Sequence, residues 1–268
     1  MLVVKIDNSP PARPPVGVAA ANAVYVEPVE GGLSRVAAVF SDRKPPVVGP
    51  VRSARETDLS LLPQFGHPTL AFSGAAPELL PLIDRASLQN ASADLMPGSY
   101  YRDPGRKAPH NLLARTDKLP VGGGWPAQSQ PDFGPAPAGG GAAGGHQEVR
   151  YRQAAIGFDW SPQQRQWLVS MDGKPYAAQD TGRVGASTVV LQQVPIRDSA
   201  FRDVAGSPSP LAETVGSGNA TVLRDGKAYP AHWSRPSPQA GTTYTTPEGA
   251  PLPFAQGQVW TVLTPAGR

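Results

Sequence analysis

The sequence predicts an α/β N-terminal domain with a mixed sheet, followed by a smaller β-rich C-terminal domain. Short apolar runs alternate with helix-start signals over residues 1–119, which is the pattern of an α/β domain. Periodicity then disappears over residues 120–147, and strand-like runs separated by Asp-Gly and similar turns fill residues 148–268. We therefore expect two domains, 1–119 and 148–268, joined by a flexible Gly/Pro-rich linker at 120–147.

The first domain begins with four predicted strands. Residues 2–6 form a short apolar run that ends in a polar turn, and a possible short helix at 16–23 leads into a strand at 23–26. Residues 33–40 are too densely apolar for clean alternation, so we expect a strand buried on both faces. A fourth strand is expected at 69–72.

Two helix starts separate these strands. Ser53 and Glu56 have the spacing of a capping box, in which Ser53 is the N-cap and Glu56 lies three residues on. The helix that they open should end at Pro63, and Pro77 should begin a second helix. Under this reading Arg55 lies in the first turn, where the helix dipole favours an anion.

The second half contains no long helical pattern. The glycine run at 139–145 has few side chains to bury and lacks the context of a phosphate-binding loop, which favours a linker. Beyond it, strands are expected at 167–171, 187–194, 220–224, 228–233 and 259–263. Bulk for the core of this domain should come from Trp160, Trp167, Trp233 and Trp260.

Composition excludes several functions. The net charge is only +3 and the basic residues occur at most in pairs, so no nucleic-acid partner is expected. Without cysteine, neither disulfides nor thiolate metal sites can form, and the four histidines lack metal-type spacing, so we expect no metal or cofactor. No run approaches the ~20 apolar residues of a membrane span, and no signal-peptide pattern precedes the first strand.

Two short strings concentrate the charged residues. One runs from Gly49 to Arg55 and contains Arg52 and Arg55, and the other is Arg106-Lys107-Ala108-Pro109-His110-Asn111. A cation at a helix start needs a negative partner, which can be an internal carboxylate or the phosphate or carboxylate of a ligand. Both alternatives stay open at this point. His110 is either a hydrogen-bonded turn residue or a general acid or base.

These strings, in their order, resemble a known family. Together with Ile6-Asp7-Asn8, Ala12-Arg13-Pro14 and the segment from Glu27 through Glu30 to Arg35, they are similar to the YerB-like lipoproteins of the bacterial envelope. The resemblance implies a location outside the cytoplasmic membrane, either membrane-anchored or secreted. Its signal and lipid anchor are not present in this chain, so we expect them ahead of residue 1 in the precursor. Membrane attachment would occur only through that anchor.

The resemblance also implies one shared cleft for the polar residues. The ligand-binding residues that we expect there are Arg13, Glu27, Arg35, Arg52, Arg55, Arg106, Lys107 and Asn111. We expect a non-enzymatic accessory or ligand-binding module associated with peptidoglycan synthesis, whose partner is a wall-synthesis protein or an anionic cell-wall component. The alternative is a hydrolase or transferase on an anionic glycosidic or phosphodiester substrate, with Glu30 or Asp7 as base and His110 as acid.

Overall fold

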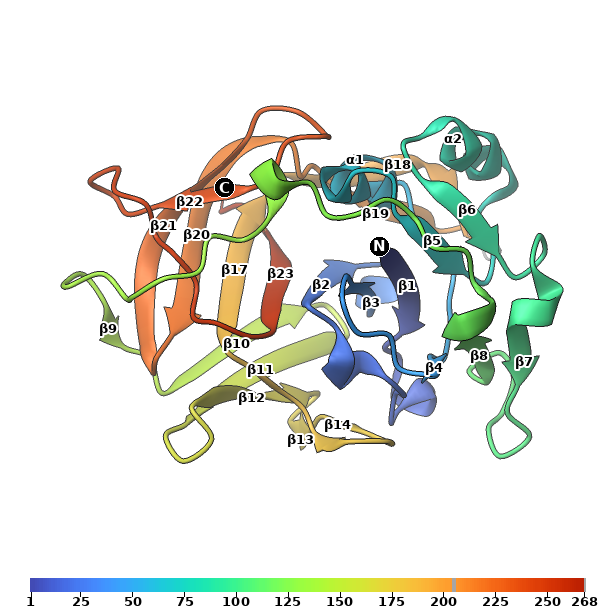
Figure 1. The fold of residues 1–268 in the computed structure, drawn as a ribbon, viewed down its shortest axis with the longest axis horizontal. Coiled ribbons are helices and arrows are strands. Elements are labelled where there is room, and N and C mark those ends of the chain that lie inside the picture. The colour runs from blue at the N-terminus through green and yellow to red at the C-terminus, as the bar shows by residue number, and fades with distance from the viewer. Residues whose placement is uncertain (204–205, 268) are drawn as a thin grey trace.

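A large mixed sheet is the centre of the molecule, and the computed structural model describes residues 1–203 and 206–267 (Figure 1). In these residues its strands lie in the order β22 (Thr243–Thr245), β21 (Lys227–Arg235), β20 (Gly216–Arg224), β17 (Thr188–Val194), β23 (Val259–Pro265), β2 (Ala23–Pro28), β3 (Ser34–Phe40), β1 (Leu2–Asp7), β5 (Thr69–Phe72) and β6 (Gln89–Ser92), with β9 (Ala142–Ala143) beside β21. Parallel pairs such as β1–β5 and β2–β23 adjoin antiparallel ones such as β2–β3, which confirms a mixed sheet.

Smaller sheets complete the architecture of the described chain. One contains β10 (His146–Tyr151), β11 (Ala154–Ser161), β12 (Gln166–Met171), β13 (Lys174–Pro175) and β16 (Gly185–Ala186), and another contains β4 (Val47–Val48), β8 (Leu112–Arg115) and β7 (Tyr100–Arg102). Two further pairs are β14 (Ala177–Ala178) with β15 (Gly182–Arg183), and β18 (Ile196–Arg202) with β19 (Pro208–Ala212).

Helices contribute little to this fold. The α-helices of the described residues are α1 (Thr57–Leu61) and α2 (Leu80–Arg85), each of fewer than two turns. Short 3-10 helices lie at Pro10–Ala12, Val18–Ala20, Glu30–Gly32, Leu62–Phe65, Pro77–Leu79, Pro97–Ser99, Thr116–Lys118 and Ala127–Ser129. The α/β description of the N-terminal half is therefore not confirmed, because strands and irregular segments replace the expected full-length helices. In the described chain, no helix has both the length and the apolar character needed to cross a bilayer.

The strand predictions fare better than the helix predictions. Strands β1, β2, β3 and β5 occur where the apolar runs predict them, and all seven residues of β3 are buried, as its dense apolar pattern indicates. The five strands predicted for the second half are also confirmed, as β12, β17, β20, β21 and β23. The helix expected at 16–23 shrinks to the 3-10 turn Val18–Ala20.

The two halves of the chain share the large sheet. Strand β2 of the first half pairs with β23 of the second, from Ala23 opposite Val259 to Val26 opposite Val262. The segment 120–147, green in Figure 1, runs between the halves, and its β9 pairs with β21. The flexibility of this segment stays a prediction. The shared sheet nevertheless means that cavities can draw residues from both halves.

Alternation along β1 places Leu2, Val4 and Ile6 on one face and Val3 and Lys5 on the other. Leu2, Val4 and Ile6 pack toward β11 and β12, in the core that contains Trp167 and Trp260. Val3 and Lys5 point to the opposite face, which α1 covers. Lys5 of β1 therefore lies on the α1 side of the sheet.

Candidate functional site

A cavity of about 380 Å³ lies where β2 ends and β3 begins. Its lining includes Arg35, Arg52 and Arg55 from the first half of the chain, and Phe201 and Ser209 from the β18–β19 pair of the second half. These three guanidinium groups, together with that of the exposed Arg202, line one hollow that both halves of the chain build. We call it the arginine cavity.

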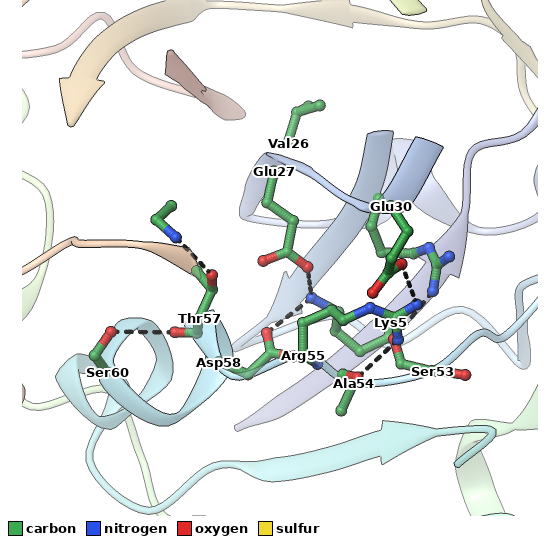
Figure 2. A network of polar contacts seen from close by, with 12 residues as sticks. Lys5, Val26, Glu27, Glu30, Ser53, Ala54, Arg55, Thr57, Asp58 and Ser60 are labelled. Atoms are coloured by element: carbon green, nitrogen blue, oxygen red, sulfur yellow. Dashed lines mark hydrogen bonds and ion pairs between the residues drawn. The ribbon is translucent and has the colours of Figure 1, made fainter. Parts of the chain in front are cut away.

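Arg55 is fixed by an internal carboxylate. Its Nη2 donates to Oε2 of Glu30 at 2.7 Å and its Nη1 donates to the carbonyl of Ala54 at 2.9 Å (Figure 2). The hydroxyl of Ser209 donates to the other carboxylate oxygen of Glu30. Burial tends to raise the pKa of Glu30, but the hydrogen bond and charge of Arg55, with the hydroxyl of Ser209, lower it overall. The internal partner that Arg55 requires is thus Glu30.

The predicted capping box is wrong. Helix α1 begins at Thr57, and the carbonyl of Ser53 accepts a hydrogen bond from Arg35 Nη1 at 3.0 Å. The side chain that bonds to the backbone ahead of the helix is that of Asp58: its Oδ2 accepts a hydrogen bond from the N–H of Arg55 at 2.8 Å. Glu56 instead accepts the hydroxyl of Ser199. Arg55 therefore precedes the helix, and its environment is set by side-chain contacts rather than by the dipole of a five-residue helix.

Arg35 has no carboxylate of the described residues within ion-pair distance, although it is only 7% exposed. Strand register places it between Asp7 on β1 and Glu27 on β2. Its Nε lacks a described hydrogen-bond partner. Burial, and then the positive charge of Arg55, lower its pKa to about 10, against the weaker opposing charge of Asp7. The guanidinium is therefore desolvated and only partly compensated.

Arg52 is the most open of the three arginines. Its side chain is 31% exposed, and its Nε lies 3.3 Å from Oδ2 of Asp7. A half-exposed contact of this length is weak and can be exchanged for another anion at small cost. Arg52 and Arg35 could thus donate hydrogen bonds to a ligand oxygen in the arginine cavity.

A closed network of charges lies beside the arginine cavity, on the same side of the sheet. The Nζ of Lys5 lies between Glu27 Oε1, with which it forms an ion pair, and Asp58 Oδ1 at 2.8 Å (Figure 2). All three side chains are at most 1% exposed. Burial raises the pKa of Glu27, against the charge of Lys5. Glu27 thus lies in the core, outside the lining of the arginine cavity.

Asp7 holds His110 rather than facing the arginine cavity. The Nδ1 of His110 lies 2.8 Å from Asp7 Oδ2, and the hydroxyl of Ser9 donates to Asp7 Oδ1 at 2.7 Å. Burial tends to raise the pKa of Asp7, but the charge of Arg35 and the bonds from His110 and Ser9 lower it overall. Because an ionised carboxylate only accepts, the Nδ1 of His110 carries the proton. The Ser9 hydroxyl is thereby used by Asp7 and is not a nucleophile activated by His110.

The remaining residues of the second string support the turns around them. Arg106 donates to the carbonyls of Ala12 and Pro14 at 3.0 and 2.7 Å, and Asn111 Oδ1 accepts from Arg102 at 2.7 Å. Lys107 is exposed, and its side chain makes no hydrogen bond or ion pair with a described residue.

Arg13 is also held by its own contacts. It binds Asp172 Oδ2 at 2.6 Å and the carbonyl of Asn8 at 2.6 Å. Like Arg106, Lys107, His110 and Asn111, it is absent from the lining of the arginine cavity. The structure therefore does not bring all the predicted residues into one cleft: it brings together Glu30, Arg35, Arg52 and Arg55.

An internal carboxylate is one of the two alternatives left open for Arg55, and Glu30 supplies it, but sequence reasoning missed Ser209 as the second partner of Glu30. Ser209 lies far along the chain, and no local signal connects it to Glu30. Lys5 had a signal, since a lone cation in an apolar strand needs a buried counter-ion, and Asp58 and Glu27 supply it. In the described parts of the chain, no group of three or more histidine and carboxylate side chains could hold a metal ion.

Family comparisons agree with this architecture of two halves. A family model described as "Protein of unknown function (DUF3048) N-terminal domain" matches residues 1–122, and one described as "Protein of unknown function (DUF3048) C-terminal domain" matches residues 147–261. The chain belongs to this family, the YerB-like proteins, as its polar strings indicate.

Comparisons of sequence and of structure both find similarity to YerB of Bacillus subtilis. The chain is 32% identical over 124 residues to "Putative lipoprotein YerB" of Bacillus subtilis (strain 168); the match covers 44% of this chain and 36% of that protein. The chain thus spans about a third of the length of the curated relative it matches. The crystal structure of the YerB protein from Bacillus subtilis has a TM-score of 0.80 at 19% identity, over 98% of this chain and 90% of that one, which shows the same fold.

Proposed function

We propose that this protein is an extracytoplasmic cell-envelope module that binds an anionic cell-wall component in the arginine cavity and assists peptidoglycan synthesis without catalysing a reaction. The printed name of the curated relative, a lipoprotein, supports a location outside the cytoplasmic membrane. Its match is partial, so location and role are carried to this chain as part of the proposal.

The incomplete compensation of Arg35 is the observation that carries this function. Four arginines line the cavity of about 380 Å³: Arg35, Arg52, Arg55 and the exposed Arg202. Its lining also contains the carboxylates of Glu30, Glu56 and Asp203; Glu30 pairs with Arg55, and Arg52 pairs with Asp7, while Arg35 has no ion pair with a described residue. An entering anion would give Arg35 the missing partner and share Arg52 with Asp7. Each charge-assisted hydrogen bond would contribute about 1.5–3 kcal/mol.

The ligand chemistry is a carboxylate or a phosphate, because a guanidinium fork fits both. Cell walls can offer the carboxylates of muramyl peptides and the phosphates of glycerol-phosphate polymers. Calorimetric titration with a soluble muramyl pentapeptide and, separately, with a glycerol-phosphate oligomer distinguishes these sources. A wall-synthesis protein would be the partner that the bound fragment brings into contact.

Arg52→Gln is the variant that tests the proposal, since Arg52 contributes little to the fold. We expect it to weaken binding of the preferred fragment by about tenfold, the loss of one charge-assisted contact. Arg85→Gln, an exposed arginine of α2 outside the arginine cavity, should bind as the parent does. If neither fragment binds the parent protein, or if Arg52→Gln binds as tightly as the parent, the proposal fails.

The enzymatic alternative has one observation in its favour, the Asp7–His110 pair. In the neutral ring the Nε2 of His110 is an acceptor, and the side chain is 20% exposed, so it could take a proton. However, neither Asp7 nor His110 lines the arginine cavity, and Glu30 is occupied by Arg55 and Ser209. Release of reducing ends or phosphate from wall fragments, lost in His110→Gln, would favour this alternative over the proposal.

A further inference from the structure

A second and larger cavity, of about 570 Å³, lies where β2 begins and β3 ends. Because the arginine cavity lies at the other end of the same antiparallel pair, the length of six-residue β2 puts roughly 20 Å between them. We call the second one the amide cavity. Any ligand there is bound independently of the proposed anion site.

Side-chain amides dominate its lining. Asn22, Gln130, Gln166, Gln256 and Gln258 all contribute, from both halves of the chain and from the connecting segment. The charged residues of this lining, Asp42 and Arg43, are adjacent and of opposite sign. The amide cavity is thus polar but without net charge, unlike the arginine cavity.

Two of these amides are left for a ligand. Gln258 is fully used, since its Nε2 donates to the carbonyl of Ala21 at 2.7 Å and its Oε1 accepts from Trp260 at 2.7 Å. By contrast, the side chains of Gln166 and of the exposed Gln256 make no hydrogen bond with any described residue. Each offers two N–H donors and one carbonyl acceptor in the wall of the cavity.

The backbone is shaped to present these groups. Gly257 has φ +128°, and a Cβ there would lie 2.2 Å from the Ser187 hydroxyl, so only glycine lets this turn approach Ser187. A Cβ on Gly185 would lie 2.6 Å from Gln166 Oε1. Both close approaches occur in the lining of the amide cavity.

An aromatic side chain is exposed at the same place. Phe133 is 38% exposed although its backbone is fixed, since it bridges Phe254 and the N–H of Phe254 donates to the Asp132 carbonyl at 2.7 Å. Trp125, also in the lining, is held by its ring contact with Phe65 at 5.1 Å and its bond to the Ser129 carbonyl at 3.0 Å. The Trp125 ring and the Phe133 backbone are therefore positioned before any ligand arrives.

We infer that the amide cavity binds a neutral oligosaccharide that carries acetamido groups. The C–H face of a sugar ring would pack on Phe133, and its hydroxyl and acetamido groups would bond to Gln166 and Gln256. A peptide is less suited, because the familiar peptide sites use a free strand edge, a purely apolar groove or a charged cluster. The lining consists instead of strand ends, turns and uncharged amides.

The probe that tests this inference is N,N′,N″,N‴-tetraacetylchitotetraose, titrated into the full chain and followed by NMR or calorimetry. Saturable binding is expected, weakened about tenfold in Phe133→Ala by loss of the aromatic contact, and also weakened in Gln166→Ala. Val121→Ala is the matched control, because Val121 is an exposed apolar residue of the same segment outside the cavity. It should bind as the parent does.

Arg52→Gln should also keep full sugar affinity, which separates this site from the proposed anion site. The inference is overturned if the tetrasaccharide does not bind, or if Phe133→Ala and Gln166→Ala, folded by their thermal melts, bind it unchanged. It is also overturned if a neutral acetylated tetrapeptide binds in its place and that binding depends on Phe133.

Discussion

The Lys5 network and the arginine cavity lie on the same side of the large sheet, yet they differ in how their charges are compensated. Lys5 has two carboxylate partners and its network has no exposed member, whereas Arg35 has no ion pair with a described residue and Arg52 is 31% exposed. Buried charges that are fully paired are compatible with a purely structural role, because an unpaired buried charge would destabilise the fold. Open space beside incompletely paired cations is what an anion site needs.

The largest expected effect is on the closed network. Lys5→Met would leave Glu27 and Asp58 buried without their cation, so unfolding free energy should fall by roughly 3–5 kcal/mol in urea titrations. Glu27→Gln should cost much less, because Lys5 keeps Asp58 and a carboxylate with a raised pKa is removed. Lys174→Met, at an exposed residue of β13, is the control. A loss under about 1 kcal/mol for Lys5→Met would remove the distinction between the two regions.

A smaller loss of stability is expected when an arginine of the arginine cavity is replaced, and its size should differ between Arg55 and Arg52. Arg55→Ala strands Glu30, whose side chain is 8% exposed, so we expect a loss of about 2–3 kcal/mol, less than for the fully buried network. Arg52→Ala removes only a half-exposed contact and should cost under about 1 kcal/mol. Thermal and urea unfolding of both variants measure this. Equal losses would mean that both arginines are scaffold.

The weakest expected effect is the acid dependence of stability. The pKa values of Asp7 and Glu30 are lowered in the folded protein, so they contribute stability above the unfolded values of about 4. This contribution is lost as pH falls through the folded pKa values. Glu27 acts in the opposite sense, because its pKa is raised and its ionisation opposes folding. The double variant Asp7→Asn, Glu30→Gln should flatten the decline below pH 4; an unchanged profile would contradict these assignments.

Strand positions could be read from the sequence, but the grouping of the polar residues could not. Apolar density alone predicts β3, because a strand buried on both faces needs no polar alternation. The strings at 49–55 and 106–111 look alike, yet only the first lines the arginine cavity. Arg106 is used by carbonyls of the turn at Ala12 and Pro14, and such partners follow from tertiary contacts that no spacing encodes.

The helix start predicted at Pro77 is confirmed by the 3-10 turn Pro77–Leu79 that leads into α2, but the start predicted at Ser53 failed for a local reason. Ser53 and Glu56 fit the capping pattern, but Asp58 reaches the Arg55 N–H instead, while Glu56 is drawn to Ser199 in the other half of the chain. Glu30 likewise needs Ser209 to complete its contacts. Because these contacts join the two halves of the chain, the arrangement of both halves must be known before the contacts of Glu56 and Glu30 can be recognised.

The measurement that tests the central claim most directly is the response of the arginine Nε–H signals to a wall fragment. In ¹⁵N NMR of the full chain, titration with muramyl pentapeptide or glycerol-phosphate oligomer should shift the Arg35 and Arg52 resonances in a saturable way. The Arg35 Nε–H has no described partner to compete with the anion, so it should move most, while exposed Arg85 should not move. Small, uniform shifts of all arginines with neither fragment saturating would contradict the account.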